Sequence, residues 1–165
     1  MTPLTNLIQP FITIQDTILD VGCGIMTPTT DLICKYILGI DMYEPYLNVV
    51  KDKHSTINMD VTELHRFPDK SYDVVIALDV IEHLEIEQAI ILLNNLKRIA
   101  RKHAFIFTPK EFHTNEEHTK NVWDLGDNEL QRHRCVITKP QLAEHGFERI
   151  QTASYKEMIL AKWSG

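Results

Sequence analysis

The stretch Ile18-Leu-Asp-Val-Gly-Cys-Gly24 is an apolar run that contains one aspartate and ends in two glycines. A short apolar run that stops at glycine predicts a buried strand, Thr17–Val21, followed by a tight turn. Three further short apolar runs end in an aspartate, at Asp41, Asp60 and Asp79. Longer amphipathic segments separate some of these runs. This alternation predicts a parallel α/β sheet covered by helices.

The same pattern extends along the whole chain and predicts one domain over residues 1–165. Strands are expected at 17–21, 36–40, 56–59, 72–78, 104–107, 147–152 and 157–163. Helices are expected at 27–34, 45–53, 85–102 and 138–146, where Thr27 and Thr138 are cap residues and Gly146 ends the last helix. The predicted fold class is therefore α/β. Its sheet is doubly wound and seven-stranded, mostly parallel, with a C-terminal antiparallel hairpin.

One long segment fits neither helix nor strand. Residues 110–132 are polar and aperiodic. An irregular stretch of this length inside a compact domain is typical of a functional loop or lid. Phe112 and Trp123 lie in it, and they are expected either to pack the loop or to form an apolar wall for a substrate.

Composition and charge exclude several classes of protein. The 165 residues carry a formal charge of −6, which disfavours a general binder of nucleic-acid phosphates. No apolar run is long enough to span a bilayer, and no signal peptide is visible. The three cysteines are scattered, which fits free thiols in a reducing compartment. These features predict a cytoplasmic protein with no membrane contact.

The predicted topology indicates where a ligand binds. In open α/β sheets, ligands bind outside the carboxyl ends of the strands. Gly22 and Gly24 allow the backbone to approach a ligand closely, because no Cβ intervenes. Asp41 follows Asp20 by twenty-one residues, about the spacing at which an acidic side chain meets a ribose diol.

A nicotinamide dinucleotide uses the same scaffold and is the first alternative. Its fingerprint requires a third glycine at position 27, where this chain has Thr27. Asp20 would also repel a pyrophosphate from the loop. An acidic residue there suits a nucleoside that carries an amino group and a sulfonium but no phosphate, which points to S-adenosylmethionine.

Four motifs in order resemble the class I S-adenosylmethionine-dependent methyltransferases, closest to the small "type 11" branch. They are Ile18–Gly24, Leu38–Met42, Met59–Val61 and Phe67–Leu84, and the segment Asn128–Phe147 is also similar to one common in that branch. The resemblance covers nearly the whole chain. It implies a Rossmann-like fold and S-adenosylmethionine as cofactor.

The resemblance also implies cofactor-binding roles for residues at each strand end. In the family, the matches to Asp20, Gly22 and Gly24 line the methionine part of the cofactor, with Cys23 between the two glycines. The other implied contacts are Asp41 with the ribose hydroxyls, Met42 with the adenine ring, Asp60 and Val61 with the adenine edge, and the carbonyls of Ala77 and Leu78 with the methionine amine. Cys23 has no evident base partner, so no nucleophilic role is expected for it. Many members have glycine where this chain has Met26, a difference that would either tighten the methionine pocket or weaken the site.

The candidates for a general base are His83, His133 and Asp79. A purely structural role, holding a loop or the lid in place, is the alternative for both histidines. His113, Glu116, Glu117, His118, His133 and Cys135 match no standard zinc spacing, so no metal site is expected.

The function expected from the motifs is methyl transfer to an unidentified small-molecule or protein acceptor. The alternative is a non-catalytic protein that binds S-adenosylmethionine or acts as a scaffold. The sequence leaves the oligomeric state open.

Overall fold

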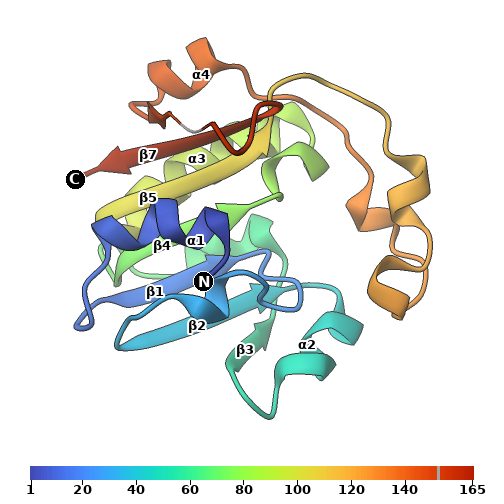
Figure 1. Ribbon diagram of the computed structural model, residues 1–165, viewed down its shortest axis with the longest axis horizontal. Helices are drawn as coiled ribbons and strands as arrows, with labels where there is room; N and C mark the ends of the chain where they lie inside the picture. The colour runs from blue at the N-terminus through green and yellow to red at the C-terminus, as the bar shows by residue number, and fades with distance from the viewer. Residues whose placement is uncertain (152) are drawn as a thin grey trace.

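The computed structural model describes residues 1–151 and 153–165, and it contains one seven-stranded sheet in the order β3-β2-β1-β4-β5-β7-β6 (Figure 1). The strands are β1 (Thr17–Val21), β2 (Tyr36–Asp41), β3 (Ser55–Asn58), β4 (Tyr72–Leu78), β5 (Ala100–Pro109), β6 (Glu148–Ile150) and β7 (Met158–Ser164). The α-helices are α1 (Pro3–Ile8), α2 (Glu44–Val50), α3 (Ile86–Ile99) and α4 (Lys139–Glu144).

Strand directions confirm the predicted fold class. Strands β1 to β5 pair in parallel, and β7 runs antiparallel to both β5 and β6. The sheet is therefore doubly wound and mostly parallel, with an antiparallel hairpin at the C-terminal end. Thr152, the last residue of one predicted hairpin strand, lies outside the described residues.

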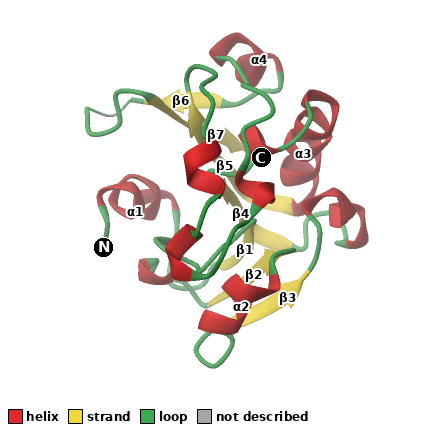
Figure 2. Ribbon diagram, turned by 90° about the vertical axis from the view of Figure 1, so that its right-hand side faces the viewer, coloured by secondary structure: helices red, strands yellow, loops and turns green. Residues whose placement is uncertain are grey.

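Helices cover both faces of the sheet (Figure 2). Side chains alternate between the faces along each strand. Ile76 of β4 is buried in the same apolar cluster as Ile8 of α1, whereas its neighbour Val75 is buried with Leu93 of α3 and Leu142 of α4. Because β4 is buried on both faces, its sequence is a continuous apolar run rather than an alternating one. No helix of the described residues is long and apolar enough to cross a membrane.

The predicted helix over 85–102 is confirmed but ends earlier, at Ile99. It begins with a capping box in which Glu85 and Gln88 exchange hydrogen bonds. Ala100 is already extended and pairs with Tyr72, so β5 starts four residues before the predicted strand over 104–107. The apolar stripe in the sequence could not show this boundary, because a buried residue such as Ala100 fits the end of the helix and the start of the strand equally well.

The predicted helix over 27–34 is wrong. The structure has only a 3₁₀ turn at Thr29–Asp31, and Thr27 caps nothing. The Thr29 hydroxyl donates to the Asp20 carboxylate, which ties this turn to the end of β1, and the chain is extended again at Leu32. A helix that the sequence reading missed, α1, begins at the N-terminus, where the Thr2 hydroxyl accepts from the Thr5 amide. The Thr2-Pro3 pair was the available signal.

Candidate functional site

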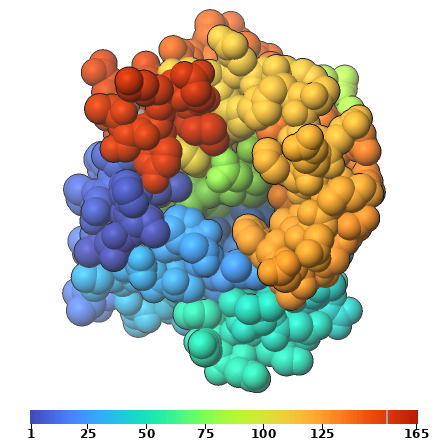
Figure 3. All heavy atoms as spheres, turned by 45° about the vertical axis from the view of Figure 1, so that its right-hand side comes forward, coloured from blue at the N-terminus to red at the C-terminus, as the bar shows by residue number. Residues whose placement is uncertain are grey.

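A cavity of about 260 Å³ opens where the carboxyl ends of β1, β2 and β4 meet. Residues 110–132, called the lid segment below, lie over this edge of the sheet, and Figure 3 shows the surface hollowed between them and the strand ends. Each strand end contributes one residue to the lining: Gly22 follows β1, Asp41 ends β2 and Asp79 follows β4. The other lining residues come from the following turns, from α3, from the lid segment and from the chain just after it: Met42, Asp60, Val61, Thr62, Val80, His83, Leu84, Glu85, Gln88, Asn128, Leu130, Gln131 and Arg134.

Gly22 is required by both conformation and space. Its φ of +65° lies in the left-handed region, and a Cβ there would come within 2.5 Å of a methyl group of Val80. A side chain at this position would therefore push the first loop away from the turn that follows β4. The close approach of these two loops shapes the floor of the cavity.

Asp41 ties the first two strand ends together. Its Oδ2 accepts from the Gly24 amide at 2.9 Å, and its Oδ1 accepts from the Tyr43 amide at 2.8 Å. Burial raises the pKa of this carboxyl above its usual value, although both amides oppose that shift. Each carboxylate oxygen has two lone pairs, so the residue can still accept further hydrogen bonds from a ligand in the cavity.

Asp20 is buried behind the glycine loop and is not among the residues that line the cavity. Burial raises its pKa to about 7, against the effect of the Thr29 hydroxyl that donates to it, and the negative charge of Asp41 adds to the rise. Cys23 is buried as well, and burial raises the pKa of its thiol far above the usual value. This property fits a packing residue rather than a nucleophile.

Met26 adopts a φ of +58°, a conformation that glycine reaches without a Cβ penalty. Its side chain is fully buried in a cluster with Cys23, Leu47 and Val50. The bulk of Met26 therefore lies beneath the loop, and the side chain is not among those that line the cavity.

The remaining candidates for cofactor contact divide into two groups. Met42, Asp60 and Val61 line the cavity, and the Asp60 carboxylate is held there because it accepts from the Thr62 amide at 2.8 Å. Ala77 and Leu78 are not among the lining residues; they pair with Ile106 and Phe107 inside the sheet.

Two buried acidic side chains follow β4: Asp79 lines the cavity, whereas Glu82 is not among its lining residues. Burial raises the pKa of Asp79 to about 6. Burial also raises the pKa of Glu82 to about 8, and the negative charge of Asp79 adds to that rise. The Glu82 carboxylate, only 2% exposed, accepts from the Thr108 hydroxyl at 3.0 Å. Glu82 is a site residue that the sequence reading did not select.

The structure brings His83 and His133 together, with 5.2 Å between their ring centroids. Burial lowers the pKa of His83 to about 4, and the charge of His133 lowers it further. Burial lowers the pKa of His133 as well. Both rings are therefore neutral near pH 7, and an unprotonated ring nitrogen can accept a proton or bind a metal.

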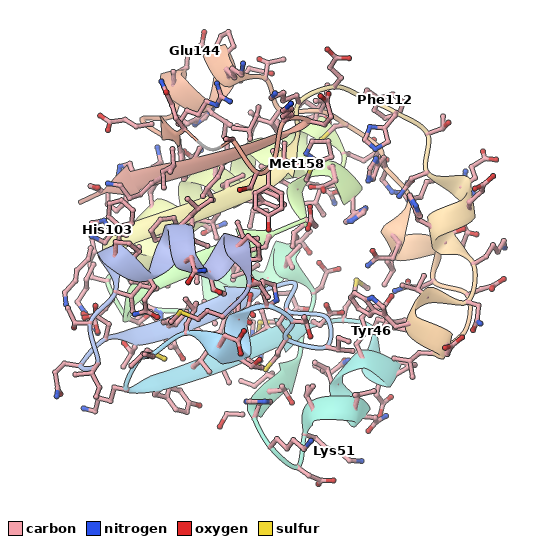
Figure 4. All side chains as sticks on the ribbon, viewed as in Figure 1. Tyr46, Lys51, His103, Phe112, Glu144 and Met158 are labelled. Carbon is pink, nitrogen blue, oxygen red and sulfur yellow. The ribbon has the colours of Figure 1, made fainter. Side chains whose placement is uncertain are left out.

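The lid segment contains three 3₁₀ turns, Glu116–Thr119, Val122–Asp124 and Glu129–Gln131, and is otherwise irregular. It is anchored to α2, as Figure 4 shows for Tyr46. The buried Tyr46 hydroxyl accepts from Asn128 Nδ2 at 3.0 Å, and the Tyr43 hydroxyl is 3.2 Å from the carbonyls of Leu125 and Asp127. These contacts hold Asn128, Leu130 and Gln131 against the cavity.

Comparison with known proteins agrees with this geometry. Residues 19–108 match a family described as "Methyltransferase domain". The search of curated proteins finds no match.

Solved structures with the same fold include three methyltransferases. An S-adenosylmethionine-dependent methyltransferase from Archaeoglobus fulgidus is 15% identical with a TM-score of 0.67, over 98% of this chain and 94% of that one. One from Mesorhizobium loti is 16% identical with a TM-score of 0.67, over 99% and 96%. The magnesium protoporphyrin IX methyltransferase from Synechocystis, with S-adenosylmethionine bound, is 14% identical with a TM-score of 0.62, over 91% and 70%.

Proposed function

The chain belongs to the methyltransferase-domain family, and from this premise we propose that it transfers a methyl group from S-adenosylmethionine to a small molecule or a protein side chain. The observation that carries the proposal is a cavity lined by two chemically different groups of residues. The first group, called the first end below, is Gly22, Asp41 and Asp60. The second group, called the second end below, is Asp79 and His83.

The first end is suited to the nucleoside part of the cofactor. Asp41 is placed to accept from the ribose hydroxyls, and Asp60 and Val61 to meet the adenine edge. Met42, which is 45% exposed and lines the cavity, is suited to pack on the adenine ring. Gly22 and Gly24 leave the backbone accessible to the methionine part.

The buried acidic residue behind the loop is suited to a cationic amine. Asp20 favours a positive charge nearby because its own charge is poorly solvated. The carbonyls of Ala77 and Leu78 remain candidates for the same amine, through the end of β4. These roles transfer from the family resemblance, residue by residue.

The second end is suited to the methyl acceptor. S-adenosylmethionine supplies an activated methyl group whose leaving sulfur is already positively charged. The protein's main contribution is to hold the acceptor atom in line with that methyl group, and such orientation can supply about 7–11 kcal/mol of the barrier. If the acceptor carries a proton, the neutral ring of His83 is placed to take it, with His133 and Asp79 beside it.

The net charge of −6 favours a small molecule or a protein side chain over bulk nucleic acid as acceptor.

The proposal has a direct test. S-adenosylhomocysteine should raise the melting temperature, whereas NAD should not. Labelled methyl groups from S-adenosylmethionine should then appear on a component of a cell extract. Binding without transfer to any extract would instead support a non-catalytic cofactor-binding protein.

A further inference from the structure

Three potential metal ligands from two distant segments meet beside the cavity. Glu82, His83 and His133 each offer one ligand atom, and these atoms lie within 4.8 Å of one another. Ligand atoms around a zinc ion bound at about 2.0–2.2 Å lie about 3–4 Å apart. Small side-chain rotations would therefore bring the three atoms around one ion.

Each of the two histidines has its Nδ1 atom beside a backbone carbonyl oxygen. His83 Nδ1 lies 3.4 Å from the carbonyl oxygen of Arg132, and His133 Nδ1 lies 3.1 Å from that of His113. A carbonyl oxygen only accepts hydrogen bonds, so these contacts favour the tautomer with the proton on Nδ1. The lone pair is then on Nε2. Metal-binding histidines are typically oriented by such a bond from the other ring nitrogen.

The third ligand, Glu82, is held by a hydrogen bond and has no basic partner among the described residues. The Thr108 hydroxyl donates a hydrogen bond to Glu82 Oε2 and fixes the orientation of this side chain. Asp79, also buried, is a second acidic side chain nearby. In the part of the chain that the structure describes, no lysine or arginine forms an ion pair with either residue. Buried carboxylates are normally paired or bound to metal.

We propose that Glu82, His83 and His133 bind a divalent transition-metal ion of the zinc type. Two imidazoles and one carboxylate favour Zn²⁺ over the harder Mg²⁺. Three protein ligands leave a fourth position open, as in catalytic zinc sites. Since His83 lines the cavity, this position is expected to face the space in which a methyl acceptor would lie.

A metal ion at this position narrows the class of methyl acceptor to hydroxyls and thiols, an inference that rests on the proposed methyl transfer. A hydroxyl or thiol bound at the open position loses its proton to water more readily, because the metal stabilises the anion. The oxygen or sulfur anion then forms a bond to the methyl carbon. The bond from that carbon to the sulfonium sulfur breaks, and its electron pair stays on sulfur. With metal bound, the histidines act as ligands rather than as bases.

Zinc titration of the metal-free protein, against a chromophoric chelator of known affinity, tests the site directly. The wild type is expected to bind one Zn²⁺ per chain, and millimolar Mg²⁺ should not displace it. His133→Gln should weaken binding at least about 100-fold, because loss of a ligand costs more than loss of a supporting residue. Thr108→Val should weaken it about 10-fold. His65→Gln, a change at an exposed histidine outside the cluster, should leave it unchanged.

Two results would overturn the proposal: no stoichiometric zinc binding by the wild type, or equal affinity in wild type and His133→Gln. His83→Gln provides a second ligand variant, and near-UV circular dichroism shows that each variant is folded. S-adenosylhomocysteine binding is measured separately on metal-free protein. A failure of the methyltransferase proposal would appear there, whatever the zinc result.

Discussion

The indole ring of Trp123 packs on the phenol ring of Tyr46, with 4.8 Å between the ring centroids. The same indole lies over Gly24, where its Cη2 atom is 3.0 Å from the position that a Cβ would occupy. Trp123 was expected either to pack the loop or to form a wall for the acceptor. The structure shows the first of these: the ring packs the lid segment on the glycine loop and α2.

This contact predicts that cofactor binding moves Trp123. A ligand that reaches Gly24 must displace the indole, whose side chain is 52% exposed and free to move outward. S-adenosylhomocysteine should therefore change the intrinsic tryptophan fluorescence. The change should persist in Trp163→Phe, because Trp163 lies on β7, and disappear in Trp123→Phe. A signal that survives in Trp123→Phe would place the ligand elsewhere.

Asp41→Ala is expected to weaken S-adenosylhomocysteine binding at least tenfold and also to lower stability. Charge-assisted hydrogen bonds contribute about 1.5–3 kcal/mol each, and the carboxylate holds both the Gly24 and Tyr43 amides. The loss of stability is expected because these two contacts join the ends of β1 and β2. From the position of Asp41 at a strand end alone, no loss of stability would be predicted. Calorimetry measures the affinity and urea unfolding the stability. Asp52→Ala, at an exposed aspartate, is the control, and an unchanged affinity in Asp41→Ala would contradict the assignment.

Asp20→Asn should change how stability depends on pH. The pKa of Asp20 is about 7 in the folded protein, above its usual 3.8, so the folded state keeps a proton that the unfolded chain has released between these values. The stability contributed by this proton is complete below pH 3.8 and is lost as pH rises through 7, by at most about 1.4 kcal/mol per pH unit.

Urea unfolding of wild type and Asp20→Asn between pH 5 and 8 isolates this effect, because the other titrating groups are common to both proteins. The asparagine oxygen can still accept from Thr29. Wild-type stability should fall relative to the variant as pH rises. Parallel stability curves would mean that Asp20 titrates near its usual value.

Tyr46→Phe should loosen the lid segment without unfolding the domain. The substitution removes the hydroxyl that accepts from Asn128, a bond of about 1 kcal/mol, while it keeps the ring that packs on Trp123. Amide hydrogen exchange over residues 128–131 should become about fivefold faster, if local opening is the route of exchange. Tyr36→Phe, on the exposed start of β2, should leave exchange there unchanged. Equal protection in Tyr46→Phe and wild type would show that the Asn128 contact does not anchor the segment.

The sequence by itself determined the sheet and one end of the site. Short apolar runs between amphipathic segments predicted β1 and β4 with the observed bounds, because burial on both faces of a central strand leaves a local signal. Asp41 and Asp60 could also be selected from the sequence. Parallel strands bring their carboxyl ends to one edge of the sheet, so the position of a residue at such an end follows from the topology alone.

Only the tertiary structure decided the other end. His83 and His133 are fifty residues apart, and the path of an aperiodic lid segment brings their rings together. Glu82 carried no sign in the sequence that it would be buried beside Asp79. The turn at Thr29–Asp31 likewise follows from a contact with Asp20 rather than from local helix preference. Periodicity records which face of an element is buried, whereas contacts between loops depend on backbone conformations that no repeating pattern encodes.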